Sequence, residues 1–426
     1  MDKSWVLHVE NFAKIKSADI EISPLMCFVG DNNSGKSYLM SLLWGILTLG
    51  KDVFPKNVSE SRTYKLCENW LSNSLGKNTL ITEEAAQLYI NWFNELLSNN
   101  KRSLLKRLFN FDVEAESIEI RNYRRNKEIS IKWEEYGTRY SVTKSYIKFP
   151  VQEDYTREDL SKMNAYVCWN LLMHGIASPL YTPIVKGRRT GEPVYLPASR
   201  TGFMLTYPQL LEKSIQTSFS VSADEGKSML TLPYVDFLQL IVRFETNKNP
   251  KHADIISFIE TKMTNGSINV KKEFVPVIKY KPTNSNKELP LFVASSVVSE
   301  VSPILLTLKS NINFNVIIIE EPEAHLHPIF QRLLYKYVVL ESNASLIITT
   351  HSTHISSVAP LKSIIHLVET DTGTDVFTTA NIDLAEKQTL DLERYIDVKK
   401  GELYLAKGII FVEGISEALL IPIFAK

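Results

Sequence analysis

The sequence predicts an α/β fold built on a parallel sheet and interrupted by a second, α+β lobe. Near the N-terminus, a glycine-containing loop lies directly between an apolar strand and an apolar helix. Towards the C-terminus, short continuous apolar runs such as residues 316–319 and 346–348 alternate with helical patterns, as in strands covered on both faces. Residues 51–193 instead contain strands that alternate between polar and apolar positions, which indicates an insertion.

The composition excludes several classes of protein. The 426 residues include 48 basic and 48 acidic side chains, and 44% are apolar, enough for two or three globular domains. The three cysteines Cys27, Cys67 and Cys168 are far apart, which argues against a disulfide framework or a zinc knuckle. No run approaches the ~20 apolar residues of a membrane span, and the N-terminus is charged. We therefore predict a cytoplasmic protein without membrane contact.

The first part of the predicted head covers residues 1–50. Residues 5–29 indicate a strand, a turn and a second strand that ends in an apolar stretch. The helix after the loop has nearly continuous apolar residues and ends at Gly50, as expected of a buried helix.

The inserted lobe is predicted for residues 51–193. Thr82 is an expected N-cap, followed by Glu83 and Glu84 in the first turn of a long helix. The segments SIEIRN, KEISIKWEE and RYSVTKSYIKF then predict a small antiparallel sheet, and EDLSKMNAYVCWNLLMHGI predicts another helix.

Residues 194–400 are predicted to form the second part of the head. A strand at 194–199 precedes helices, short strands around 267–280 and a helix at 297–308. The apolar strand NVIIIEE, a helix and the strands SLIITTHS and SIIHLVET follow in the order of a parallel sheet. Residues 401–426 then contain one more predicted strand, GIIFVEG, and the start of a helix.

The N-terminal loop matches the phosphate-binding pattern G-x-x-x-x-G-K-[ST]. It consists of Gly30, Asp31, Asn32, Asn33, Ser34, Gly35, Lys36 and Ser37. In such loops backbone N–H groups converge on phosphates, the lysine reaches the outer phosphates and the hydroxyl ligates Mg²⁺. Because a strand precedes the loop and a helix follows it, we favour an ATP and Mg²⁺ site over a turn that binds nothing.

Two carboxylates and one histidine end apolar strands. We predict that Glu320 holds the metal and that Glu321 polarises the attacking water; the alternative is a solvent-exposed strand end. His351 follows the next strand and is predicted to contact the γ-phosphate rather than to be an ordinary surface histidine. For His325 and His327 we favour a structural loop over a metal pair.

Basic side chains form three groups within the lobe, with Tyr123 and Trp133 among them. The groups comprise Lys101, Arg102, Lys106 and Arg107, then Arg121, Arg124, Arg125 and Lys127, and finally Lys186, Arg188 and Arg189. Contact with phosphate backbones and an ordinary solvated face fit these groups equally well, because acidic residues lie between them.

The chain resembles the ABC-type ATPase heads of the overcoming-lysogenization-defect (OLD) nucleases and, more broadly, SMC-like ATPases. The resemblance lies in LHVENFAKIKSADIEI, GDNNSGKS, YLPASR, ASSVVSE, VIIIEEPEAHLHP, ITTHS and FVEGISEALLIP, in the family's order. It implies a homodimer or higher homo-oligomer in which Ser295 and Ser296 of one protomer reach ATP on the other. Val297 stands here where the family has glycine.

The C-terminal segment FVEGISEALLIP resembles the opening strand and helix of a Toprim nuclease domain. The resemblance implies that Glu413 is a metal ligand or general base and that Glu417, one helical turn later, joins the Mg²⁺ or Mn²⁺ shell. The family's D-x-D carboxylates come later, and no aspartate follows Glu413 in these residues. We therefore expect the nuclease site to be incomplete in this chain.

These observations predict an ATP-hydrolysing head that gates a Toprim DNA nuclease in bacterial antiphage defence. The alternative is an ATP-dependent sensor or scaffold for nucleic acid or protein, without nuclease activity of its own. The resemblance implies DNA as a partner of the full-length protein and, in some contexts, a retron reverse transcriptase with its DNA, or a helicase. A transporter ATPase ranks third, because ASSVVSE differs from a transporter signature.

Overall fold

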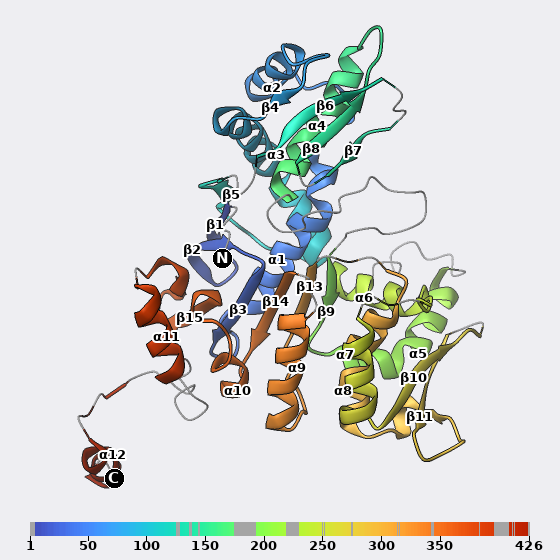
Figure 1. Cartoon of the computed structure of the whole chain (residues 1–426), viewed down its shortest axis with the longest axis vertical. Coiled ribbons are helices and arrows are strands. Elements are labelled where there is room, and N and C mark those ends of the chain that lie inside the picture. Colours follow the sequence, from blue (N-terminus) through green and yellow to red (C-terminus); the bar gives the residue numbers. More distant parts are fainter. Residues whose placement is uncertain are drawn as a thin grey trace.

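The computed structural model describes residues 5–424, except 125–127, 136–138, 144, 174–192, 219–229, 249, 251, 274–275, 313, 315, 342–344, 383, 396–408, 411 and 413. A large sheet with helices on both faces forms the body, and a smaller lobe stands on one end of it (Figure 1). The helix α12 (Ile415–Phe424) lies apart from this sheet.

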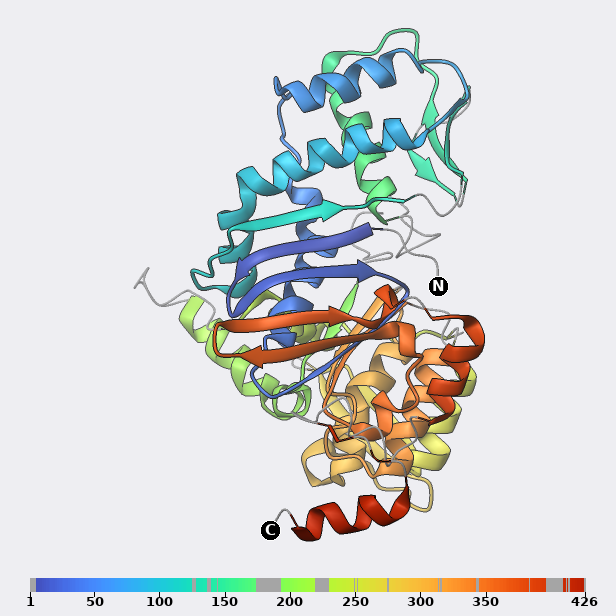
Figure 2. The same ribbon diagram turned by 90° about the vertical axis from the view of Figure 1, so that its left-hand side faces the viewer.

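Nine strands of the described residues form the large sheet, in the order β5-β1-β2-β16-β15-β3-β14-β13-β9. Their bounds are β1 Trp5–Phe12, β2 Ile15–Ile22, β3 Leu25–Gly30, β5 Ser117–Arg121, β9 Val194–Leu196, β13 Val316–Glu320, β14 Ser345–Thr350, β15 Ile364–Thr370 and β16 Gly373–Thr378. The five strands from β15 to β9 are parallel, whereas β1 pairs antiparallel with β2 and β5. Figure 2 shows the strands from β5 to β15 one below the other.

Alternating residues of the central strands pack on opposite faces of the sheet. On β3, Met26 and Phe28 join one core cluster, and Cys27 and Val29 join the other. The first cluster includes α1 (Lys36–Leu49) and α3 (Glu83–Phe109). The second includes α5 (Arg200–Ser218), α6 (Leu232–Val242), α7 (Ala253–Phe258), α8 (Ser296–Lys309) and α9 (Pro328–Glu341). Burial on both faces explains why these strands are continuously apolar.

The N-terminal segment departs from the prediction in strand number. Three strands form in place of two, because Ser23 and Pro24 interrupt the second one between β2 and β3. Proline has no N–H group to continue a ladder, so the chain changes direction and β3 enters the sheet between β15 and β14.

The lobe contains α2 (Arg62–Ser72), most of α3, α4 (Arg157–Met173) and a sheet in the order β4-β6-β8-β7. The strands are β4 Thr79–Leu80, β6 Ser130–Glu134, β7 Ser141–Val142 and β8 Tyr146–Pro150. Thr82 caps α3 as predicted, since its Oγ1 accepts from the Ala85 N–H at 3.2 Å.

The predicted antiparallel sheet of the lobe was wrong in two respects. The segment SIEIRN forms β5 and extends the large sheet beside β1, because Ile118 and Ile120 bury their side chains in its core. The segment RYSVTKSYIKF turns back on itself as β7 and β8, so that β8 lies between β7 and β6 and runs parallel to β6.

Shorter elements complete the second part of the head. They are the three-stranded sheet β10 Gly266–Lys271, β11 Val277–Pro282 and β12 Leu289–Pro290, a π-helical turn Ile259–Met263, the 3-10 turns Leu291–Val293, Leu361–Ser363 and Thr379–Asn381, and the helices α10 Thr353–Ser356 and α11 Glu386–Tyr395. A further 3-10 turn, Gly50–Val53, follows α1 directly. The predicted helix 297–308 and the strands around 267–280 are therefore confirmed within a residue or two.

The prediction of a strand at GIIFVEG was wrong for the residues of this segment that the structure describes. Ile409, Ile410 and Val412 belong to no strand and are exposed. A buried strand needs neighbours for its N–H and C=O groups, and no described strand lies beside this segment. Within the described chain, no helix combines the length and the apolar character that crossing a bilayer requires.

Candidate nucleotide-binding site

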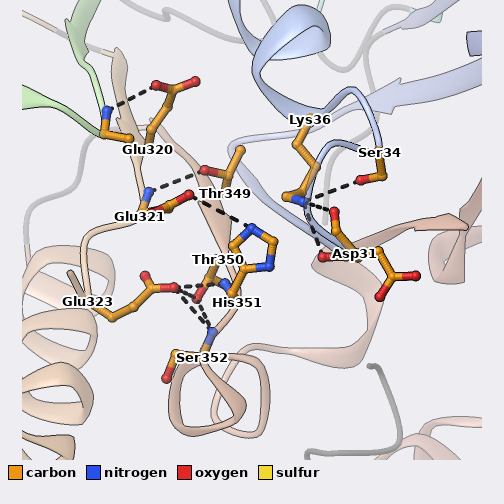
Figure 3. A network of polar contacts seen from close by, with 12 residues as sticks. Asp31, Ser34, Lys36, Glu320, Glu321, Glu323, Thr349, Thr350, His351 and Ser352 are labelled. Atoms are coloured by element: carbon orange, nitrogen blue, oxygen red, sulfur yellow. Dashed lines mark hydrogen bonds and ion pairs between the residues drawn. The ribbon is translucent and has the colours of Figure 1, made fainter. Parts of the chain in front are cut away.

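The sheet order brings the predicted site residues together at one edge. Strand β14 lies between β3 and β13, all three are parallel, and Thr349 of β14 is level with both Phe28 and Glu320. Parallel strands present their carboxyl ends at the same edge, which is where an open α/β sheet binds ligands. The loop after β3, the acids after β13 and the histidine after β14 therefore face one space (Figure 3).

The backbone of the loop requires glycine at two positions. Gly30 has φ +145°, and a Cβ there would lie 2.2 Å from the carbonyl oxygen of Leu367 on β15. Gly35 has φ +95° and immediately precedes α1, and the first N–H groups of a helix have no partner within the helix. Both glycines shape the chain into a cradle at a helix N-terminus, which favours an anion.

Lys36 is the cation of this cradle. Its side chain is buried, and Nζ donates to the carbonyl oxygens of Gly30 at 3.1 Å and Asp31 at 2.6 Å and to Ser34 Oγ at 3.3 Å. Burial lowers the pKa of Lys36 to about 8, although Glu321 and Asp31 act in the opposite direction. An additional anion beside Nζ would restore the charged form.

The two carboxylates at the C-terminal end of β13 have different surroundings. Glu320 is buried; its Oε2 accepts from the Ala198 N–H at 3.0 Å, and its Oε1 is buried without a hydrogen-bond partner in the described structure. Glu321 has a left-handed backbone, φ 43°, fixed by its N–H, which donates to Thr349 O at 3.0 Å. Its side chain is 42% exposed. Glu321 is thus open to solvent, whereas the buried Glu320 carboxylate is held by the Ala198 N–H.

His351 joins these acids from β14. Its Nε2 lies 3.8 Å from Oε1 of Glu321, and the side chain is 29% exposed. Burial, and next the charge of Lys36, lower the pKa of His351. The neutral imidazole is therefore favoured at pH 7.

Glu323 is a site residue that sequence reasoning missed. Its Oε1 accepts from Thr350 Oγ1 at 2.6 Å, from the His351 N–H at 2.7 Å and from the Ser352 N–H at 3.1 Å. Burial raises the pKa of Glu323 despite these bonds. The carboxylate thereby fixes the backbone that carries His351. The sequence signal that could have identified Glu323 is that it is the third acid of the motif EEPE.

Arg200 is a second residue for which the sequence analysis predicted no role, although it ends YLPASR, one of the segments that resemble the family. Its guanidinium is fully buried and donates to the carbonyl oxygens of Glu320 at 2.7 Å and Glu321 at 3.1 Å. The contact between Arg200 and Glu320 joins residues 120 positions apart in the chain. Only the tertiary structure reveals it.

Ser295 and Ser296 lie elsewhere. Both are exposed at the N-terminus of α8, and no hydrogen bond or ion pair among the described residues joins them to the loop. Glu413 lies outside the described residues, and Glu417 is exposed on α12. These four residues remain predictions.

The remaining polar candidates do not form a second site in the described residues. His325 is 72% exposed, with Nε2 3.9 Å from Glu300, and His327 Nδ1 accepts from the Ile329 N–H. No group of three or more His, Cys, Asp or Glu side chains in the described part is arranged to hold a metal.

Several basic residues of the lobe are paired with acids. The pairs are Arg107 with Asp52 at 2.7 Å, Arg121 with Glu119 at 3.0 Å and Arg102 with Asp112 at 3.8 Å. Arg125, Lys127, Lys186, Arg188 and Arg189 lie outside the described residues. These ion pairs reduce the positive charge that α3 presents to a phosphate backbone. For α3 they therefore favour an ordinary solvated surface over a nucleic-acid contact.

The donor set fits Mg²⁺. The buried Oε1 of Glu320 has no hydrogen-bond partner in the described structure, and the exposed Ser37 is the second residue of α1. Carboxylate and hydroxyl oxygens are the ligands that Mg²⁺ prefers. Ser37 and Glu320 would hold the ion, which supplies charge neutralisation for phosphates when bound.

Comparisons with known proteins agree with this geometry. Residues 6–166 match the family model described as "AAA ATPase domain", and residues 215–357 match "AAA domain, putative AbiEii toxin, Type IV TA system". Endonuclease GajA of Bacillus cereus (strain HuB5-5) is 34% identical over 145 residues, which cover 27% of this chain. The match spans 20% of the length of that relative.

Solved structures of SMC heads are also similar. An SmcHead bound to the C-winged helix domain of ScpA has a TM-score of 0.40 at 15% identity and covers 91% of this chain and 98% of its own. The Smc head of Pyrococcus furiosus bound to the C-terminal domain of ScpA has a TM-score of 0.38 at 12% identity, and the match covers 93% of this chain and 100% of that structure's chain. Scores this low add nothing to the fold assignment, which rests on the sheet order and the ATPase-domain matches.

The predicted resemblance to OLD-family ATPases is confirmed by the match to GajA and by the ATPase-domain models. The α/β ATPase-head fold is confirmed as well. The chain therefore has an α/β fold, matches ATPase-domain models over residues 6–166 and 215–357, and is similar in part to an endonuclease.

Proposed function

We propose that this chain hydrolyses ATP and that hydrolysis gates a metal-dependent Toprim DNA nuclease in antiphage defence. The observation that carries the ATPase part is the convergence of Lys36, Glu321 and His351 at one sheet edge. The similarity to an endonuclease supports the nuclease part.

Each residue has a distinct role in the proposed reaction. The loop from Gly30 to Ser37 binds the phosphates through backbone N–H groups, and Lys36 neutralises the outer ones. Glu320 and Ser37 bind the metal. Glu321, open to solvent, orients the attacking water and accepts its proton. His351, neutral and held by the backbone that Glu323 fixes, donates to the transferred phosphoryl group.

The second half of the site is proposed to come from another copy of the chain. Ser295 and Ser296 are exposed at a helix N-terminus, where two hydroxyls and free N–H groups suit an anion. A head-to-head dimer would place them on the partner's nucleotide. Val297 follows them, so the backbone approach is less close than glycine would permit.

The test is steady-state ATP hydrolysis by the purified chain with Mg²⁺, with Glu321→Gln as the inactive comparison. Glu153→Gln is a matched control, because Glu153 is exposed in the lobe, outside the site. We expect turnover by the wild type and the control only. ATP binding without turnover in all three proteins would instead support the sensor or scaffold function.

A further inference from the structure

Arg200 is a buried cation that lies behind the site rather than in it. It occupies the first position of α5, and its side chain has 0% exposure. Burial lowers the pKa of the guanidinium, and Glu300 is the strongest opposing charge. An arginine is rarely buried completely unless its donors are satisfied, so its partners explain its position.

One set of partners is the backbone at the end of β13. Nη1 donates to Glu320 O at 2.7 Å and to Pro197 O at 3.3 Å, and Nη2 donates to Glu321 O at 3.1 Å. Glu321 is the residue with the left-handed backbone, φ 43°. A non-glycine residue keeps that conformation only where its surroundings hold it. Arg200 therefore helps to set the direction of the Glu321 side chain.

The other partner lies on α8. Nη2 is 3.5 Å from Oε2 of Glu300, whose side chain is 7% exposed, and Nε is 3.5 Å from its carbonyl oxygen. Glu300 follows Ser296 by four residues, one helical turn. One guanidinium thus contacts both the helix that carries Ser296 and the backbone that carries Glu321.

We propose that Arg200 is a positioning residue that couples α8 to Glu321, with Glu300 as its second anchor. The proposal rests on ATP hydrolysis at Glu321 as proposed above. A shift of α8, when a partner's nucleotide binds at Ser295 and Ser296, moves the Glu300 carboxylate. Arg200 follows it and changes the orientation of Glu321. Occupancy of one site of a dimer thereby controls turnover in the other.

A purely architectural role makes a different prediction. A buried ion pair that only holds α5 against α8 would change the stability of the fold and leave turnover by the folded protein intact. The coupling role requires a fall in kcat with ATP affinity preserved, because Arg200 contacts neither the loop nor Lys36 in the described structure.

The experiment compares Arg200→Lys, Glu300→Gln and the double variant in the full chain. Lysine keeps the charge beside Glu300 but cannot donate in a fixed fork to two carbonyls. Lys309→Gln is the matched control, because Lys309 pairs with Glu260 at 2.9 Å in the last turn of the same helix, away from β13. Kinetics, calorimetric affinity for a non-hydrolysable ATP analogue and melting temperature are measured for each.

We expect both single variants to lower kcat about tenfold, with affinity within about twofold of the wild type. The double variant should lose no more than the worse single variant, since the two residues act as one unit. The control should lower only the melting temperature. Wild-type kcat in folded Arg200→Lys and Glu300→Gln would overturn the coupling and leave the ATPase intact. Absence of turnover in the wild type would overturn the proposed function and the coupling together.

If Arg200→Lys does not fold, Glu300→Gln decides alone. That change keeps the shape of the side chain, and unchanged kcat in the folded protein would reject the coupling.

Discussion

Nε2 of His351 lies 3.8 Å from Oε1 of Glu321, although the two residues follow different strands, β14 and β13. Because β13 and β14 are adjacent and parallel, this contact depends on their register, in which Glu320 is level with Thr349. The neutral imidazole and the exposed carboxylate therefore flank the same reacting atoms in the proposed mechanism.

Lys36→Ala should weaken ATP binding by at least about tenfold, because it removes the buried cation of the cradle. The variant also loses the bonds from Nζ to Gly30 O and Asp31 O, which hold the loop. Calorimetric titration with a non-hydrolysable analogue measures the effect. Lys65→Ala, which breaks an exposed ion pair with Glu60 in the lobe, is the control. Wild-type affinity of Lys36→Ala would contradict the assignment.

Glu321→Gln should preserve analogue affinity and lower kcat by about 100-fold or more, because the amide keeps the shape and loses the charge that activates water. Single-turnover and steady-state assays on the same preparation separate binding from chemistry. Unchanged turnover would place the water-orienting group at another residue.

ATP affinity should fall as pH rises through about 8. The pKa of Lys36 is lowered to about 8 by burial, and bound phosphates raise it by favouring the ammonium form. Binding is therefore strongest below that pH, and above it binding takes up a proton. Titrations between about pH 7 and 9 test this. Lys36→Arg, charged throughout the range, should show no such dependence; equal slopes in both proteins would reject it.

A non-hydrolysable ATP analogue should shift the protein towards a dimer, because Ser295 and Ser296 are exposed and, in the proposed head-to-head arrangement, complete the site in trans. Sedimentation velocity with and without the analogue measures the shift. Ser296→Arg should prevent it by bulk and charge. A monomer under both conditions would defeat the head-to-head arrangement.

The purified 426-residue chain should not cleave DNA with Mg²⁺ or Mn²⁺. Glu413 and Glu417 supply at most two carboxylates of the segment that resembles Toprim, and two divalent ions need more anionic ligands than that. A plasmid-nicking assay checks this. Cleavage that disappears in Glu413→Ala would show that a nuclease site is complete within this chain.

The loop, the acid pair and the strand-end histidine could be predicted from local patterns, because each follows a buried strand whose apolar run is visible in the sequence. Helix α3 could be predicted from its cap, since a side chain that bonds its own first turn is a local interaction. Strand β5 could not be assigned to the correct sheet, because its alternation of polar and apolar residues fits an edge strand of the large sheet as well as a strand of the lobe. Its partner, β1, is about a hundred residues away in the chain.

The sequence by itself indicated the phosphate loop, the alternation of strands and helices and the candidate residues Lys36, Glu321 and His351, because these depend on residue type and short-range spacing. Only the tertiary structure decided that β14 separates β3 from β13, and that Arg200 joins Glu300 to the backbone of Glu321. Those relationships depend on strand order and on burial between distant segments, where a charged side chain is stable only if several remote carbonyls and a carboxylate meet it.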